Sequence, residues 1–358
     1  MGKRIYERAV SFLTILIALL VFGIIVLVHE FGHYAVAKKS GVKVEEFAIG
    51  MGPKLISKQY GETLYSIRIL PMGGFCKMLG EDSASEDKRS FTNKSVGTRI
   101  AVIFAGPFMN LVLAFVIIAW FVGSNGYITT RIDHVLPDTP AASIGLQPGD
   151  KIISLDGQRI HIRQEISLIL SQVKDHPIEI IASRDGEKIT KVITPVIDEK
   201  TNQGFLGISF ESKEQGEATI LEILGQSLWQ VVFLVKQVVL GFIQIITGQV
   251  SRQQIAGPVG VIQIIGESYE SGLKTSFYIA IQNVLYFAAI ISANLGVMNL
   301  LPIPALDGGR LVFLIIEGLR GKPIAVEKEG MIHFIGFALL MVLMVFVLYN
   351  DVVRIITH

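Results

Sequence analysis

Cysteine and charge are scarce in this sequence. Its only cysteine is Cys76, so an internal disulfide is excluded. Charged residues make up 18% of the 358 residues, whereas they make up about a quarter of an ordinary soluble domain. The net charge is +1 and no basic patch is present, which argues against nucleic acid as a partner. With 51% hydrophobic residues, these shortages indicate an integral membrane protein with soluble parts.

In place of charge the sequence has long apolar runs. Crossing the hydrocarbon core of a bilayer takes a helix of about 20 residues, and four runs are long enough: residues 9–28, 100–123, 276–301 and 331–349. The first run follows three basic residues, but no small-residue cleavage site comes after it, so we interpret it as a retained span. Gly106, Pro107 and Asn110 in the second run are interpreted as packing and kink features.

A fifth apolar run, at residues 227–250, is ambiguous. Its residues Gln230, Gln237 and Gln244 repeat every seven positions, and this polar stripe suits a helix in the membrane interface as well as one that crosses. We favour the interfacial position and expect about four transmembrane helices. The eleven Lys and Arg residues between the first two runs then place that segment in the cytoplasm and residues 124–212 outside it.

The end of the first run carries the pattern His29-Glu30-x-x-His33. Residues four apart lie on one face of a helix, so both imidazoles can bind one metal ion, with Glu30 beside it as a general base. A catalytic zinc site needs a third protein ligand. Our candidate is Asp307, because a carboxylate at the end of an apolar run is costly unless it is paired or bound to a metal. The sequence therefore predicts one catalytic Zn²⁺ ion at the membrane, toward its cytoplasmic side.

Residues 41–79 alternate apolar and polar positions between glycines and prolines, which predicts short β-hairpins. In one interpretation these strands dip into the membrane and present an edge to an extended substrate, which Tyr65, Ile67 and Ile69 contact. In the other they form a cytoplasmic hairpin domain that does not touch the substrate. The sequence leaves both interpretations open.

Residues 124–212 predict a compact soluble domain. Strands are expected at residues 128–135, 151–155, 177–183 and 188–196, and helices at residues 141–144 and 164–173. This order, with the run Ala141-Ala142-x-x-Gly145-Leu146-x-x-Gly149-Asp150-x-Ile152, resembles a PDZ domain. Such domains bind an extended peptide as an added strand and often capture its C-terminal carboxylate. The alternative is a domain that acts only as a spacer or steric gate.

The chain resembles the site-2 protease family of intramembrane zinc metalloproteases, in the bacterial branch that includes regulator of sigma E protease. Three features carry the resemblance: the two ligand motifs in this order, the hairpins through Pro71-Met72-Gly73-Gly74-Phe75, and the PDZ-like insert. The resemblance covers essentially the whole chain. It implies a polytopic α-helical protein of the bacterial inner membrane, with a membrane-associated β-hairpin region and one inserted PDZ-like α+β domain. The implied reaction is cleavage in or near the transmembrane segment of a single-pass membrane protein, such as an anti-sigma factor or a remnant signal peptide, after a first cut elsewhere.

The resemblance also implies the roles of the site residues. In the family two histidines and an aspartate hold zinc, a glutamate is the base and an asparagine helps to hold the substrate; these roles carry over to His29, His33, Asp307, Glu30 and Asn299. We add Asn294 as a second residue able to bind substrate backbone groups. Two departures bear on gating of the substrate: Arg310 stands where many relatives have His, and enterobacterial members have two PDZ domains.

The expected organisation has four parts: residues 1–123 with two spans and the hairpin region, 124–212 as the PDZ-like domain, 213–275 as an interfacial helix and linker, and 276–358 with the last two spans. The histidines outside the motif, His333 among them, are expected at surfaces or interfaces. One rival function is a non-catalytic PDZ-bearing membrane adaptor with a structural metal site. Another is a metal transporter, but that needs further acidic or His ligands, and the second and fourth runs have none in their interiors.

Overall fold

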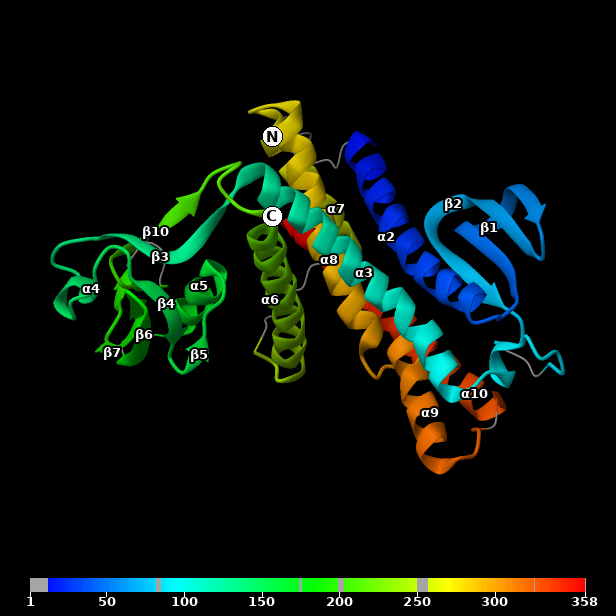
Figure 1. Ribbon diagram of the computed structural model, residues 1–358. Coiled ribbons are helices and arrows are strands. Elements are labelled where there is room, and N and C mark those ends of the chain that lie inside the picture. The colour runs from blue at the N-terminus through cyan, green and yellow to red at the C-terminus, as the bar shows by residue number, and fades with distance from the viewer. Residues whose placement is uncertain are drawn as a thin grey trace. The chain divides into compact units, whose positions relative to one another are not determined.

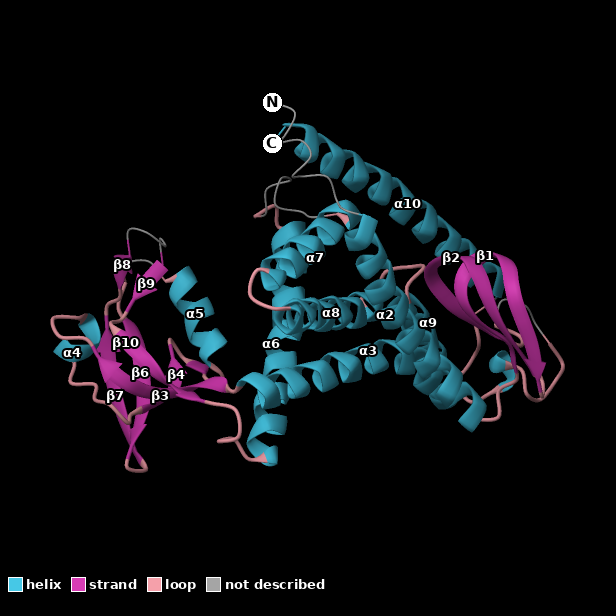
Figure 2. Cartoon of the chain, turned by 90° about the horizontal axis from the view of Figure 1, so that it is seen from above, coloured by secondary structure: helices cyan, strands magenta, loops and turns pink. Residues whose placement is uncertain are grey.

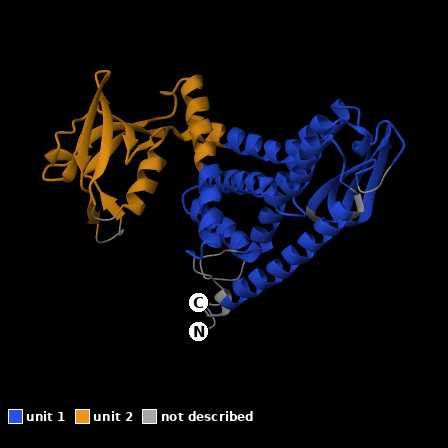
Figure 3. Cartoon of the chain, turned by 90° about the horizontal axis from the view of Figure 1, so that it is seen from below, with its two compact units in different colours: residues 1–117, 234–358 blue, residues 118–233 orange. Residues whose placement is uncertain are grey.

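The computed structural model describes residues 12–81, 85–173, 176–198, 203–249, 257–324 and 326–357. The three basic residues at the N-terminus lie outside this part of the chain. The described residues form two compact units, one of residues 1–117 and 234–358 and the other of residues 118–233 (Figure 3).

Long apolar helices dominate the first unit (Figure 1). The four predicted runs correspond to four long helices: α2 (Phe12–Lys39), α3 (Val96–Asn125), α8 (Phe277–Leu300) and α10 (Val326–Thr357); residues 9–11 of the first run lie outside the described part of the chain. With α6 (Ile220–Ile246), five helices of the described residues are long and apolar enough to cross a membrane. Shorter helices are α7 (Pro258–Leu273), α9 (Asp307–Arg320) and the 3-10 helix η1 (Phe91–Asn93). The predicted multi-pass helical membrane protein is confirmed; whether α6 crosses stays a prediction.

Small residues let three of these helices approach closely. A Cβ added at Gly32 of α2 would lie 2.3 Å from the carbonyl oxygen of Ala105 in α3, and one at Gly296 of α8 would lie 2.9 Å from the carbonyl oxygen of Pro107. The hydroxyl of Ser292 donates to the carbonyl of Asn110 at 2.8 Å. Close backbone contact of this kind is how helices pack in a bilayer, where apolar burial gives little driving force.

The hairpin region consists of two long strands, β1 (Val44–Tyr60) and β2 (Thr63–Met78), rather than several short hairpins. Figures 1 and 2 show the pair as strongly curved. Both strands fold back on themselves, because Ile49 pairs with Ile67 and also with Gly74, while Ile67 pairs with Ile49 and Ile56. The result is a small sheet of four segments in the order 74–78, 44–49, 63–67 and 54–60.

This order corrects the expectation that Tyr65 and Ile67 form an edge. Both lie in the inner segment 63–67, whose backbone pairs on one side with residues 44–49 and on the other with residues 54–60. Ile69 follows in the bend and is 50% exposed. The bend needs glycine at Gly50, which has φ +86°, and where a Cβ would lie 2.5 Å from the carbonyl oxygen of Leu70.

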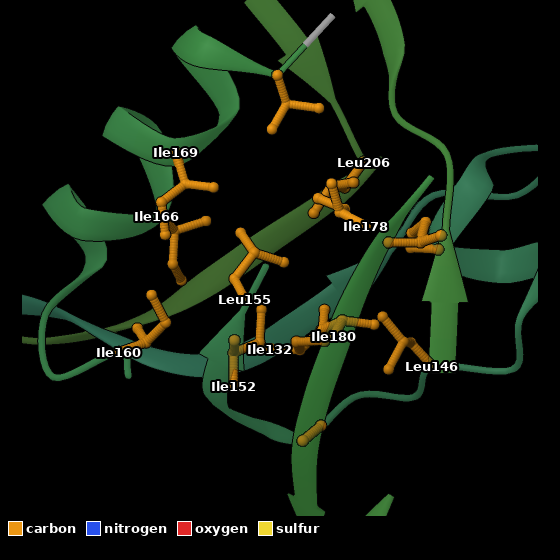
Figure 4. Packing of buried hydrophobic residues seen from close by; sticks show 14 residues of the cluster. Ile132, Leu146, Ile152, Leu155, Ile160, Ile166, Ile169, Ile178, Ile180 and Leu206 are labelled. Atoms are coloured by element: carbon orange, nitrogen blue, oxygen red, sulfur yellow. The ribbon is translucent and has the colours of Figure 1, made fainter. Parts of the chain in front are cut away.

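The second unit is built on an antiparallel sheet in the order β10-β3-β4-β6-β7, with β5 paired to β4. Its elements are β3 (Tyr127–Val135), α4 (Pro140–Ser143), β4 (Lys151–Leu155), β5 (Gln158–Arg159), α5 (Arg163–Gln172), β6 (Ile178–Arg184), β7 (Glu187–Ile193), β8 (Val196–Asp198), β9 (Gln203–Phe205) and β10 (Ile208–Lys213). Ile132, Ile152, Leu155, Ile166 and Ile180 are among the residues that fill its core (Figure 4). This is the predicted PDZ-like α+β domain.

A buried ion pair holds the turn before β4 of this domain. The fully buried Asp150 accepts hydrogen bonds from Arg184 Nε at 2.7 Å and from the backbone N–H of Gln147 at 2.9 Å. The Arg184 guanidinium keeps the pKa of the Asp150 carboxyl below its usual range. The turn that carries the PDZ-like sequence run is therefore fixed by electrostatics as well as by packing.

Candidate metal centre

The predicted ligands meet at one point, although they come from opposite ends of the chain. His29 and His33 lie one turn apart on α2, are each 7% exposed, and have their Nε2 atoms 3.2 Å apart. Asp307 is the first residue of α9 and places Oδ2 3.1 Å from His29 Nε2 and 3.4 Å from His33 Nε2. Among the described residues this is a group of donors able to hold a metal ion.

The three donor atoms fit a zinc ion. A tetrahedral zinc site with bonds of about 2.0 Å has ligand atoms about 3.3 Å from one another, and the triangle here has sides of 3.1, 3.2 and 3.4 Å. The buried Asp307 Oδ2 accepts no hydrogen bond from the described residues, although two ring nitrogens lie close to it. A buried carboxylate oxygen without a hydrogen-bond partner, beside two imidazole nitrogens, is an arrangement that a shared cation satisfies.

Helix α3 orients both histidines. His33 Nδ1 lies 2.8 Å from the carbonyl oxygen of Val102 and donates its proton there, so the lone pair of Nε2 faces the other ligands. The side-chain Nδ2 of the fully buried Asn110 lies 3.2 Å from His29 Nδ1, while its Oδ1 has no hydrogen-bond partner among the described residues. An amide turned so that its oxygen faces Nδ1 accepts that proton and directs His29 in the same way.

Gly106 provides the space in which the histidines meet. A Cβ at this position would lie 2.3 Å from His33 Nε2 and 2.9 Å from His29 Nε2. The interpretation of Gly106 and Asn110 as packing and kink features alone is therefore wrong. The signal that could have found them is their spacing, because Val102, Gly106 and Asn110 are four residues apart and share one face of α3.

Glu30 lies beside a cavity of about 720 Å³ that also contains the predicted ligands. Strand β2 passes next to it, since a Cβ at Gly74 would lie 3.5 Å from Glu30 Cγ. Residues from four further segments complete the lining: Phe75, Cys76, Lys77, Met78, Glu81, Ile103, Ala305, Leu306, Arg310, His333, Phe334 and Phe337. Arg310 forms an ion pair with Glu81 at this cavity. Glu30 can therefore reach a peptide bond that approaches the three ligands.

The five residues predicted to bind substrate lie elsewhere. Asn299 is partly buried and Asn294 exposed on α8, and neither lines the metal cavity. Tyr65 and Ile67 line a second, apolar hollow of about 460 Å³, where the Tyr65 hydroxyl lies 2.5 Å from that of Tyr34. Ile69 lines neither hollow. Their roles in substrate binding stay predictions.

Comparisons with known proteins agree with this geometry. The model of peptidase family M50 matches residues 17–343. An inferred zinc metalloprotease of Clostridium acetobutylicum is 40% identical over 96% of this chain and 98% of its own length. The zinc metalloprotease RasP of Geobacillus kaustophilus is 32% identical over 97% of this chain and 98% of its own length. The regulator of sigma-W protease RasP of Bacillus subtilis is 31% identical over 95% of this chain and 98% of its own length.

The PDZ domain of the SdrC-like protein from Listeria monocytogenes is 26% identical over 24% of this chain and 86% of its own, with a TM-score of 0.21. The family match spans both ligand motifs and most of the chain between the first and last long helices. The chain therefore belongs to peptidase family M50 and is a zinc-dependent membrane metalloprotease.

Proposed function

We propose that this protease cleaves a single-pass membrane protein, such as an anti-sigma factor or a remnant signal peptide, in or near its transmembrane segment after a first cut by another protease. The observation that carries this is the position of Glu30 and the three proposed ligands beside one cavity: Glu30 and the histidines lie within the long apolar helix α2, and Asp307 starts α9, which follows the long apolar helix α8. The name of the Bacillus subtilis relative, regulator of sigma-W protease, supports a substrate that controls a sigma factor.

The chemistry follows from the residues around the cavity. A zinc ion held by His29, His33 and Asp307 would act as a Lewis acid toward the scissile carbonyl and toward water. Glu30 takes the proton of the attacking water and later gives it to the leaving amine, as a general base and then a general acid. Val102 and Asn110 keep both imidazoles oriented during these steps.

A transmembrane substrate has to unwind before it is cut, because its peptide groups are hydrogen-bonded within the helix. Segment 74–78 of β2 can bind the extended form. It pairs with β1 on one side and has no strand partner on the other among the described residues, and Phe75, Cys76, Lys77 and Met78 line the metal cavity. We place strand addition there rather than at Tyr65–Ile69, with Asn299 and Asn294 binding further backbone groups.

The sidedness of the protein is part of the proposal. The excess of Lys and Arg between α2 and α3 supports a cytoplasmic location for the metal centre and an extracytoplasmic one for the PDZ-like domain. That domain would screen membrane-embedded substrates before they reach the metal centre, either by binding an exposed terminus along the edge strand β10 or by excluding large domains.

Two substitutions test the proposed chemistry. In purified protein, Glu30→Gln should retain zinc but cleave a transmembrane reporter about 10²–10⁴-fold more slowly, since the general base is lost. Asp307→Ala should lose both zinc and cleavage. Glu267→Gln, at an exposed position of α7, is the control and should behave as the wild type. Unimpaired cleavage by zinc-loaded Glu30→Gln protein would rule out the mechanism.

A further inference from the structure

His333 lies on α10, far in the sequence from the histidine motif, and contacts the turn that precedes Asp307. Its Nδ1 accepts a hydrogen bond from the backbone N–H of Ala305 at 2.8 Å. The side chain is 18% exposed and lines the metal cavity. His333 thus lies at an interface between α10 and this turn, as expected from the sequence, and this interface borders the metal cavity.

The turn between α8 and α9 has few hydrogen bonds of its own. Of its six residues, 301–306, the two prolines have no N–H to donate. The N–H of Ile303 donates to the carbonyl of Leu301 at 2.7 Å, and that of Leu306 to the carbonyl of Ile303 at 3.2 Å. The N–H of Ala305 instead leaves the turn and bonds to the side chain of His333. The turn is therefore held in part by another helix.

Ala305 has an unusual backbone conformation. Its φ is +76°, in the left-handed region that a residue with a Cβ disfavours. Such a conformation persists only where the surrounding structure fixes it. The bond to His333 is one such constraint, and the packing of Gly336 is a second, since a Cβ there would lie 2.4 Å from Pro304 Cβ. Helix α10 thus packs directly against the turn.

Any movement of this turn reaches Asp307. Ala305 is two residues away, and a Cβ at Gly308 would lie 2.1 Å from the carbonyl oxygen of Leu301, so the turn and the start of α9 are in backbone contact. We propose that His333 is a positioning residue for the metal centre, which fixes Asp307 beside the two histidines by holding Ala305 in its left-handed conformation. This inference rests on the proposed role of Asp307 as a zinc ligand.

The test compares His333→Asn with His333→Gln in the full-length protein in detergent. Asn places its side-chain oxygen as many bonds from Cα as Nδ1 of histidine, whereas Gln places it one bond further. His333→Gln should bind zinc about tenfold more weakly in competition with a chelator, and kcat should fall with KM nearly unchanged. His333→Asn should stay close to the wild type. Equal zinc affinity of all three proteins, or an equal loss in both variants, would overturn the inference.

A second substitution addresses the mechanism. Glycine adopts a positive φ without strain, so Ala305→Gly in the His333→Gln protein should recover most of the lost zinc affinity. Failure to recover it would show that His333 does not act through Ala305. Val342→Ala, at a 70% exposed position of the same helix, controls for general effects on α10. A wild-type protein that binds no zinc would instead refute the proposed metal site itself.

Discussion

At the scale of single residues, Gly106 is the most constrained position of the metal centre. Gly106→Ala should abolish zinc binding, because the added methyl would lie 2.3 Å from His33 Nε2 and the imidazole would have to leave its position. Zinc content of the purified protein measures this. Gly97→Ala in the same helix is a matched control, since nothing lies within 4 Å of the added Cβ. Full zinc occupancy in Gly106→Ala would show that the site can rearrange.

The sequence could predict the residues that meet in the candidate metal centre but not those that contact and orient them. His29, Glu30 and His33 stand out by their spacing on one helix. Asp307 stands out because an unpaired carboxylate at the end of an apolar run is energetically costly. Asn110 shows only its spacing of four residues from Gly106 on the same face of α3, and His333 shows no signal of this kind. Their roles depend on which helix faces pack together, and that information is absent from the local pattern of one sequence.

At the scale of elements, the free edge of the curved sheet is open to a direct test. Adjacent residues on a strand direct their N–H groups to opposite sides of the strand. Of the two substitutions Phe75→Pro and Cys76→Pro, one therefore removes an N–H group that faces the open edge. The other removes a bond to β1. If a substrate adds as a strand, the edge-facing variant should raise KM for the transmembrane reporter while zinc content stays at the wild-type level.

Ile67→Pro provides the comparison for this experiment. Ile67 pairs with Ile49 on one side and with Ile56 on the other. A proline there should therefore disrupt the sheet itself, in addition to any contact with the substrate. Unchanged cleavage by both Phe75→Pro and Cys76→Pro proteins, each shown to be folded, would exclude strand addition at residues 74–78. The sequence predicted strands in this region from alternation, but not the bend at Gly50, which moves Tyr65 and Ile67 from an edge to the interior.

The directions of the packed helices bear on whether α6 crosses the membrane. Helix α3 runs antiparallel to α2: Val102, near its start, contacts His33, and Ile117, further along, packs near Val21. Helix α8 runs parallel to α2. Val284, near the start of α8, packs near Val21, and the end of α8 leads to Asp307, which lies beside His33. Helix α3 therefore ends on the side where α8 begins, which requires an even number of crossings between them.

Between α3 and α8, only α6 is long enough to cross among the described residues. With one candidate helix, an even number of membrane crossings between α3 and α8 can only be zero. We therefore predict that α6 lies in the membrane interface, as its glutamine stripe suggests. In a Cys76→Ala protein, Gln215→Cys and Gln249→Cys flank α6 at exposed positions. An impermeant thiol reagent applied to intact cells should label both or neither. Labelling of one alone would show that α6 crosses.

At the scale of the whole molecule, zinc should stabilise one unit and not the other. The three proposed ligands all belong to the unit of residues 1–117 and 234–358. A ligand present at 100 times its Kd stabilises the fold that binds it by about 2.7 kcal/mol. Chelation should therefore raise amide hydrogen exchange in that unit and leave residues 118–233 unchanged, because the latter have a core of their own.

Asp307→Ala protein should show the exchange pattern of the chelated wild type even with zinc present. Equal increases in both units would mean that they unfold together. A difference between a helix-rich part and an inserted strand-rich part was predictable, because apolar runs and a strand-rich segment differ in composition. The edge strand β10 was not predicted. It pairs with β3, which lies at the other end of the domain sequence, and such a long-range pairing leaves no local pattern.

The order of the proposed ligands along the chain has a consequence for biosynthesis. Ribosomes deliver the two histidines and the glutamate first, and the inserted domain follows before the aspartate emerges. A nascent or truncated chain thus carries a base and two ligands without the third, and without the α10 helix that contacts the turn before it. If Asp307 is the third ligand, we expect proteolytic activity only after Asp307 and α10 have been synthesised, so a partly made chain would not cleave other proteins at the insertion site.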